Sequence, residues 1–183
     1  CQFFDCMGFG TPLVMGLRIL YSQVCNKGGV EMKDVLEPDM QIKIREALIE
    51  LLQGPQLKFQ RRIVFEQQGK LIVFWDGSLT AFGACAYIVS GGGSHLLTSA
   101  GKVIGKGKYT APQSEMAAAA LAVRVGCKVQ TEMCDTKFTQ VMYIGDSQIV
   151  CKIIATGRPC RLDVFYGSRL MFIQENTNPR QWA

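Results

Sequence analysis

The stretch LIVFWDGS, residues 71–78, is the strongest strand signal in this chain. Its first five residues are apolar, and β-branched and aromatic side chains favour a buried strand. The run ends in Asp76, and Gly77 and Ser78 then turn the chain. An acid at the end of a buried strand lies at the edge of a sheet, where α/β folds assemble their functional sites.

The residues that follow extend this strand into an α/β pattern. Segments 81–90 and 95–104 are predicted to be strands, so the first three strands form an antiparallel meander. Pro112 opens a helix that continues over 114–128, because proline is tolerated in a first helical turn. Further along we expect a polar loop at 129–137, a strand at 139–144, helices at 147–155 and 162–174, and the start of a fifth strand at 181–183. This order predicts a mixed five-stranded sheet, with three antiparallel strands and then parallel strands, flanked by helices.

Residues 1–66 have a different character from the rest of the chain. Amphipathic helices are predicted at 13–24 and 38–52, and the sequence NKGG separates them. The chain lacks an initiator Met, so we expect it to be part of a longer protein. We interpret residues 1–66 as a small helical segment that joins the main domain, residues 67–183, to an upstream part of that protein.

Composition narrows the class of protein. The 183 residues are 48% hydrophobic, which suits one domain, or one domain with a small appendage. No apolar run reaches the roughly 18–20 residues that span a bilayer, and no signal-peptide pattern begins the chain, so we expect an intracellular protein. The eight cysteines form no CxxC pair and His95 is the sole histidine, which favours reduced thiols over a zinc site or a disulfide framework.

Three carboxylates lie in settings that a sheet could bring together. Asp76 ends one apolar run, Glu115 opens an alanine-rich helix, and Asp146 ends a second apolar run just before another helix. Clustered carboxylates repel one another unless a cation lies between them, and hard oxygen ligands favour Mg²⁺ or Mn²⁺. The pattern predicts a two-metal site for phosphodiester chemistry. Each acid alone also fits a surface or helix-capping role.

The net charge of +5 is unevenly distributed. Basic residues gather near the acids, and clustering of this kind indicates a polyanionic partner. Ser147 and Gln148 are placed to contact phosphate or a 2′-hydroxyl group. The predicted nucleic-acid contacts are Lys102, Lys106, Lys108, Gln113, Ser147, Gln148 and Arg158.

The order of these motifs resembles the ribonuclease H domain of reverse-transcribing elements. Residues 74–78 (FWDGS) followed by 82–87 (FGACAY) are similar to the first hairpin of that family. Residues 111–116 (APQSEM) are similar to its helix-opening glutamate motif, and 144–150 (IGDSQIV) to its third motif. The resemblance implies two Mg²⁺ ions held by the three acids, with Asp76 bridging them.

The N-terminal segment narrows the resemblance to Pao/BEL-type LTR retrotransposons. Residues 4–9 (FDCMGF) followed by Pro12 are similar to the region that joins polymerase to ribonuclease H in those elements. Cys6 stands where that family usually has Pro, and Gln113-Ser114 stand where it usually has Arg-Leu. The family's fourth metal-binding Asp follows the last strand, and the chain ends at Ala183 before that point.

The resemblance implies a specific activity with named partners. The domain would cut the RNA strand of an RNA/DNA hybrid during reverse transcription, beside the polymerase domain of the same polyprotein. The alternative is an inactive domain of the same fold that binds nucleic acid or packs against the polymerase. An actin-like ATPase would need a second similar domain, Asp76-Gly77-Ser78 is not the order of an aspartic protease, and no local motif supports His95 in a Ser or Cys hydrolase.

Overall fold

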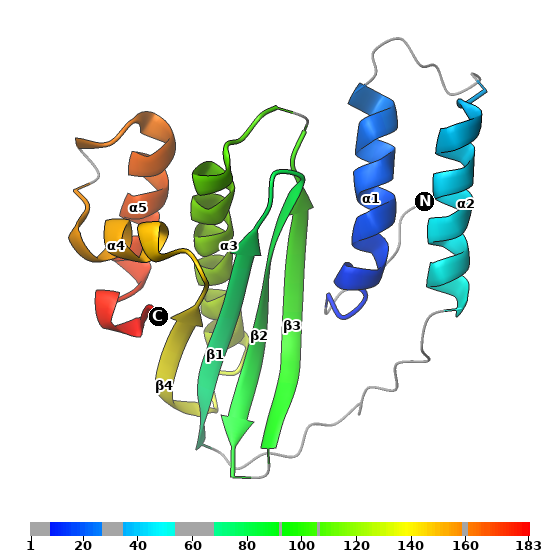
Figure 1. Cartoon of the computed structure of the whole chain (residues 1–183). Helices are drawn as coiled ribbons and strands as arrows, with labels where there is room; N and C mark the ends of the chain where they lie inside the picture. The colour runs from blue at the N-terminus through cyan, green and yellow to red at the C-terminus, as the bar shows by residue number, and fades with distance from the viewer. Residues whose placement is uncertain (1–7, 27–34, 54–67, 92, 106, 159–160) are drawn as a thin grey trace.

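The computed structural model describes residues 8–26, 35–53, 68–91, 93–105, 107–158 and 161–183 (Figure 1). Its centre is a mixed four-stranded sheet in the order β3-β2-β1-β4. The strands are β1 (Gln68–Gly77), β2 (Ala81–Ser90), β3 (Gly93–Val103) and β4 (Lys137–Ile144). β1 pairs antiparallel with β2 and parallel with β4, and β2 pairs antiparallel with β3. The predicted α/β architecture and antiparallel meander are therefore confirmed.

One face of the sheet carries the hydrophobic core. Along β1, Leu71, Val73 and Trp75 are buried, whereas Phe74 and Asp76 between and beyond them are exposed. This alternation follows from the period of two in a strand, which sends successive side chains to opposite faces. Asp76 therefore lies on the face of the sheet opposite to the core.

Helix α3 (Ala111–Glu132) covers the core face and contacts all four strands. Its alanines, including the fully buried Ala118, Ala119 and Ala122, let the helix backbone approach the sheet closely. Helices α4 (Gln148–Thr156) and α5 (Val164–Asn176) pack against α3 on the side away from the sheet (Figure 1). The predicted loop at 129–137 was placed too early, because Val129 is buried and its core contacts extend α3 by another turn.

Two N-terminal helices lie at the β3 edge of the sheet (Figure 1). They are α1 (Thr11–Asn26) and α2 (Pro38–Gln53), as predicted. α1 packs on β3, and α2 packs on α1. A Cβ atom on Gly101 of β3 would lie 2.2 Å from the Met15 methyl carbon, so the start of α1 packs directly on that strand. The boundary predicted at residue 66 falls within 54–67, outside the described residues, and stays a prediction. In the described part of the chain, no helix is long and apolar enough to cross a membrane.

The prediction of a fifth strand was wrong for the residues described. The 3₁₀-helix η2 (Pro179–Gln181) takes up the first residue of the expected strand. Trp182 then forms an isolated parallel bridge with Tyr143. The Ala183 N–H donates to the Tyr143 carbonyl and the Gly145 N–H donates to the Ala183 carbonyl, both at 3.0 Å. Two residues beside β4 make a bridge but are too few for a ladder.

The cysteines that the structure describes are free thiols, in agreement with the sequence: Cys25, Cys85, Cys127, Cys134 and Cys151. Burial raises the pKa of the Cys85, Cys127 and Cys151 thiols above the ordinary value for cysteine. A raised thiol pKa lowers the fraction of reactive thiolate, which suits packing residues rather than nucleophiles. Cys1, Cys6 and Cys160 lie outside the described residues.

Replacing Leu71 with Ala tests the core that β1 shares with α3. Leu71 is fully buried, so Leu71→Ala should lower the free energy of unfolding by about 2–5 kcal/mol through lost burial and a residual cavity. Urea denaturation measures this change. Leu79, which is 62% exposed in the turn after β1, is the matched control, and Leu79→Ala should change stability by no more than about 0.5 kcal/mol. Equal losses in the two variants would contradict this core assignment.

Candidate active site

The parallel pairing of β1 with β4 brings two of the predicted acids to the same edge of the sheet. The register pairs Phe74 with Ile144, and each acid follows its strand residue by two positions. Asp76 and Asp146 are both exposed and line the same cavity of about 720 Å³. Thr11, Pro12 and Met15 of α1 also line this cavity.

Gly77 allows the end of β1 to touch the first turns of α3. A Cβ atom at this position would lie 2.7 Å from the Ser114 carbonyl oxygen and 2.8 Å from the Glu115 backbone nitrogen. Any larger residue would therefore push the helix away from the strand. The close approach places the backbone of Glu115 beside the residue that follows Asp76.

Ser147 links Glu115 to the turn that carries Asp146. Ser147 is buried and is the N-cap of α4, where its hydroxyl oxygen accepts a hydrogen bond from the Val150 backbone N–H. The same hydroxyl donates a hydrogen bond to the Glu115 carboxylate. The side chain of Glu115 is thus directed toward the residue next to Asp146. Ser147 faces inward here, so its contact with nucleic acid stays a prediction.

Gly145 lets the turn that carries Asp146 lie directly against a buried ring. A Cβ atom on Gly145 would lie 2.3 Å from the indole ring of Trp75, so only glycine lets the chain pass over this buried ring. Trp182 packs edge-on against Trp75 at 6.0 Å and stacks on Tyr143 at 4.7 Å between ring centroids. The turn that presents Asp146 therefore rests on a rigid aromatic cluster.

The three acids share one corner of the fold without forming a preassembled metal cluster. The Asp76 carboxylate accepts a hydrogen bond from the Gly77 backbone N–H at 2.7 Å. Within the described ranges, no group of three or more His, Cys, Asp and Glu side chains lies close enough to hold a metal ion. The structure brings Asp76 and Asp146 onto one cavity and ties Glu115 to Ser147. The donor set still fits Mg²⁺, because all three side chains offer hard carboxylate oxygens.

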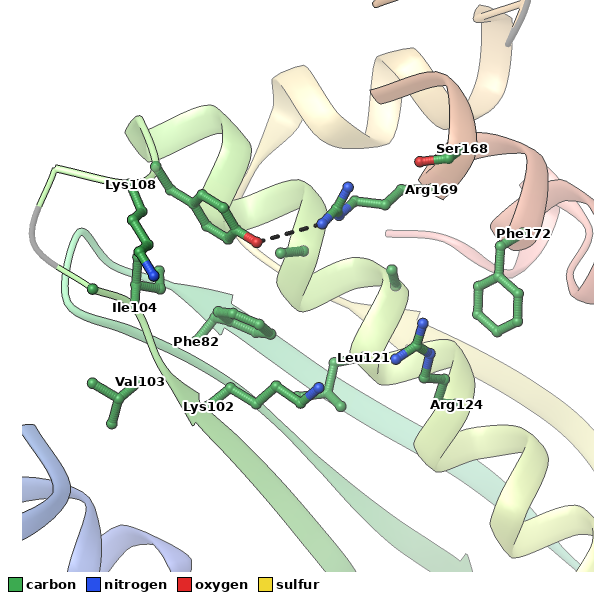
Figure 2. Close-up of a pocket in the computed structure, with 14 residues that line it drawn as sticks. Phe82, Lys102, Val103, Ile104, Lys108, Leu121, Arg124, Ser168, Arg169 and Phe172 are labelled. Atoms are coloured by element: carbon green, nitrogen blue, oxygen red, sulfur yellow. Dashed lines mark hydrogen bonds between the residues drawn. The ribbon is translucent and has the colours of Figure 1, made fainter. Parts of the chain in front are cut away.

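The predicted basic contacts lie elsewhere on the molecule. Lys102, at the end of β3, and Lys108 line a second cavity of about 510 Å³ between the sheet, α3 and α5 (Figure 2). By strand alternation this cavity opens on the core face, whereas Asp76 and Asp146 line the cavity on the other face. Lys106 lies outside the described residues.

The other predicted polar contacts divide between structural and exposed positions. The Gln113 side-chain oxygen accepts a hydrogen bond from the Thr110 backbone N–H at 2.9 Å, which completes a capping box at the start of α3. Gln148 is exposed at the first residue of α4, and Arg158 is exposed after the end of that helix. These two side chains are accessible to a partner, and their role stays a prediction.

Sequence reasoning missed two arginines that line the second cavity. Arg124 lies in α3 and Arg169 in α5, and both border the cavity that contains Lys102 and Lys108 (Figure 2). Neither arginine stands near a motif in the sequence. The single local signal is Arg124 itself, a charge that interrupts an alanine-rich helix.

The mixed sheet with its flanking helices has a ribonuclease H-like fold, and the sequence comparison identifies the family. The profile of the Pao retrotransposon-like RNaseH-like domain matches residues 1–147. The chain belongs to this family. No curated protein sequence matches the chain significantly.

Two solved structures of a foamy viral protein support the fold. The chain is similar to a foamy viral protease-reverse transcriptase in complex with an RNA/DNA hybrid, with 14% identity, a TM-score of 0.51, and coverage of 96% of this chain and 21% of that one. A dRH form of that protein in complex with double-stranded DNA gives 16% identity, a TM-score of 0.52, and coverage of 97% and 28%. RNase H1 from the halophilic archaeon Halobacterium salinarum NRC-1 matches at 20% identity, a TM-score of 0.40, and coverage of 62% and 82%. The chain therefore spans 21% and 28% of the length of the two foamy viral chains.

Replacing Gly77 with Ala tests the contact between β1 and α3. The added methyl group would meet backbone atoms at 2.7 Å, so Gly77→Ala should lower the free energy of unfolding by about 1–3 kcal/mol. Gly16 in α1 has open space around its Cβ position, and Gly16→Ala should stabilise the chain by about 0.5–1 kcal/mol through helix propensity. Chemical denaturation of both variants measures the difference. A neutral Gly77→Ala variant would show that the helix does not depend on this approach.

Replacing Ser147 with Ala tests the link to Glu115. Asp163 caps α5 through the Tyr166 backbone N–H at 3.0 Å, on a different helix from Ser147, so Asp163→Ala is a control for the loss of a cap. Each variant should lose about 0.5–2 kcal/mol of stability. Only Ser147→Ala should move the ¹³C chemical shift of the Glu115 side-chain carboxyl group, measured by NMR. The same shift in both variants would argue against a direct bond.

Proposed function

We propose that this domain is the ribonuclease H of a Pao/BEL-type LTR retrotransposon, an endonuclease that hydrolyses the RNA strand of RNA/DNA hybrids during reverse transcription. The observation that carries the proposal is the shared cavity of Asp76 and Asp146 at the sheet edge of a member of the Pao family. The hydrogen bond from the Ser147 hydroxyl to the Glu115 carboxylate supports placing the third acid beside the turn that carries Asp146.

The three acids are the proposed ligands for two Mg²⁺ ions, with Mn²⁺ as a substitute. When bound, the ions would supply an activated water and stabilise the charge on the leaving oxygen. Asp76 and Asp146 would present carboxylate oxygens from the exposed face of the sheet, where an extended substrate has access. Glu115 would contribute from the start of α3, held by Ser147 on one side.

The proposed substrate is a polyanion, which suits the net charge of +5. The foamy viral relative is described in complex with an RNA/DNA hybrid, and its fold is similar to this one. The side chains proposed to contact the hybrid are those predicted from sequence: Lys102, Lys106, Lys108, Gln113, Ser147, Gln148 and Arg158. Gln148 and Arg158 are the exposed members on the side of α4, close in sequence to Asp146.

The proposed protein partner is the upstream polymerase domain of the same polyprotein. α2 contains no buried residue, and it exposes Ile42, Leu48 and Leu52. Apolar side chains of this kind are unfavourable in water and suit a surface that a neighbouring domain covers. A retroelement protein of this type would act inside the cell, in the cytoplasm, in a virus-like particle or in the nucleus.

A second function is favoured by one observation. The acids do not form a three-residue metal-binding group among the described residues. An inactive module of the same fold, which binds nucleic acid or supports the polymerase, would have no need of such a group. The two functions differ in whether any cleavage occurs.

Substitution of Asp76 tests the nuclease. Asp76→Asn removes a charged ligand worth several kcal/mol to the transition state, so Mg²⁺-dependent cleavage of a labelled hybrid should fall about 1,000-fold. Asp135→Asn, an exposed acid after α3, is the control and should cleave at the normal rate. Cleavage is measured in the 183-residue chain and in a polypeptide that continues beyond Ala183. Normal turnover by Asp76→Asn would end the nuclease proposal, and hybrid binding in EDTA without cleavage in either polypeptide would favour the inactive module.

A further inference from the structure

The second cavity gathers positive charge from four separate parts of the chain. Lys102 comes from the end of β3, Lys108 from the segment before α3, Arg124 from α3 and Arg169 from α5. Figure 2 shows the charged ends of Lys102 and Arg124 extending toward one another along the cavity. The four side chains are far apart in sequence, so the cluster is a product of the tertiary fold.

None of this charge is neutralised by a described neighbour. No Asp or Glu is among the described residues that line the cavity. Lys128 and Glu132, which form an ion pair, lie outside the cavity. Like charges in one concave site repel, and the low-dielectric walls strengthen the repulsion, so the arrangement favours a bound anion.

Arg169 is held in a defined orientation, and Arg124 lies near an aromatic ring. The Arg169 guanidinium donates to the Phe165 carbonyl at 2.9 Å and to the Tyr109 hydroxyl at 3.5 Å, and it lies 3.5 Å from the centroid of the Phe165 ring. Arg124 lies 5.4 Å from the centroid of the Phe172 ring. Side chains that are ordered in advance lose less entropy when they bind a ligand, and a planar guanidinium matches the oxygens of a phosphate group.

Aromatic rings lie beside the positive charge. Phe82 and Tyr109 are stacked with their centroids 6.5 Å apart, and both line the cavity together with Phe172. Rings next to cations are the usual setting for a nucleotide, because a base or sugar can pack on the ring while the phosphate meets the charge. The volume of about 510 Å³ lies within the range of pockets for small ligands.

We propose that this cavity is a phosphate-binding site for a nucleotide unit, centred on Arg124, Arg169 and Lys102. The phosphate could belong to a nucleic-acid strand or to a free nucleotide, since both present the same chemistry. The site is distinct from the carboxylates, because Asp76 and Asp146 line the cavity on the other face of the sheet. It shares Lys102 and Lys108 with the proposed function but requires neither metal nor cleavage.

Binding measured in EDTA tests the site without any contribution from catalysis. The probes are a fluorescein-labelled 12-nucleotide single-stranded DNA, followed by fluorescence anisotropy, and ATP, followed by calorimetry. Lys102→Gln and Arg124→Gln remove exposed charges from the cavity, and each should weaken binding about fivefold or more. In each variant, the slope of the logarithm of the DNA-binding constant against the logarithm of salt concentration should also become shallower by about one.

Arg18→Gln, on the exposed side of α1, removes the same charge away from the cavity and should bind within about twofold of the parent chain. Thermal unfolding of all variants checks that the fold is retained. The probe that binds more tightly, and loses more affinity in the variants, identifies the source of the phosphate. If the Lys102→Gln/Arg124→Gln double variant binds both probes as the parent does, the site is excluded, whereas failure of cleavage alone leaves it standing.

Discussion

The contact between the alanine-rich helix α3 and the sheet is the constraint on which the rest of the structure depends. Because the buried residues of α3 are mostly small, the helix backbone lies close to the sheet, and Gly77 lets the first turns touch the end of β1. This approach places Glu115 at the edge where β1 and β4 end. On its other side α3 supports α4 and α5, so the same helix also aligns Ser147 with Glu115.

The sheet separates two sites of opposite charge. The acids Asp76 and Asp146 lie on the face that α1 borders, and the basic cavity lies on the face that α3 covers. Phe82 is the residue that lines both cavities, at the start of β2. A negative site suits cations and a positive site suits phosphates, so the two faces of the sheet differ in the charge of the ligand they favour.

Much of the architecture could be predicted because its signals are local. An apolar run followed by a turn predicts the strand within residues 71–78, and Pro112 marks the start of α3. Two element boundaries were predicted wrongly because they depend on contacts outside the local sequence. The end of α3 was placed too early because the burial of Val129 depends on the sheet, and the fifth strand was expected because η2 is not evident from residues 179–181.

The sequence by itself determined the element order, the three acids and the family resemblance, because each is written in a short run of residues. The tertiary structure alone decided which side chains meet. Ser147 turns inward to Glu115, Gln113 caps its own helix, and Lys102 joins Arg124 and Arg169 rather than the acids. These pairings depend on how a helix packs on a sheet. Packing between segments that are distant in the chain cannot be predicted from the spacing of residues within a short motif.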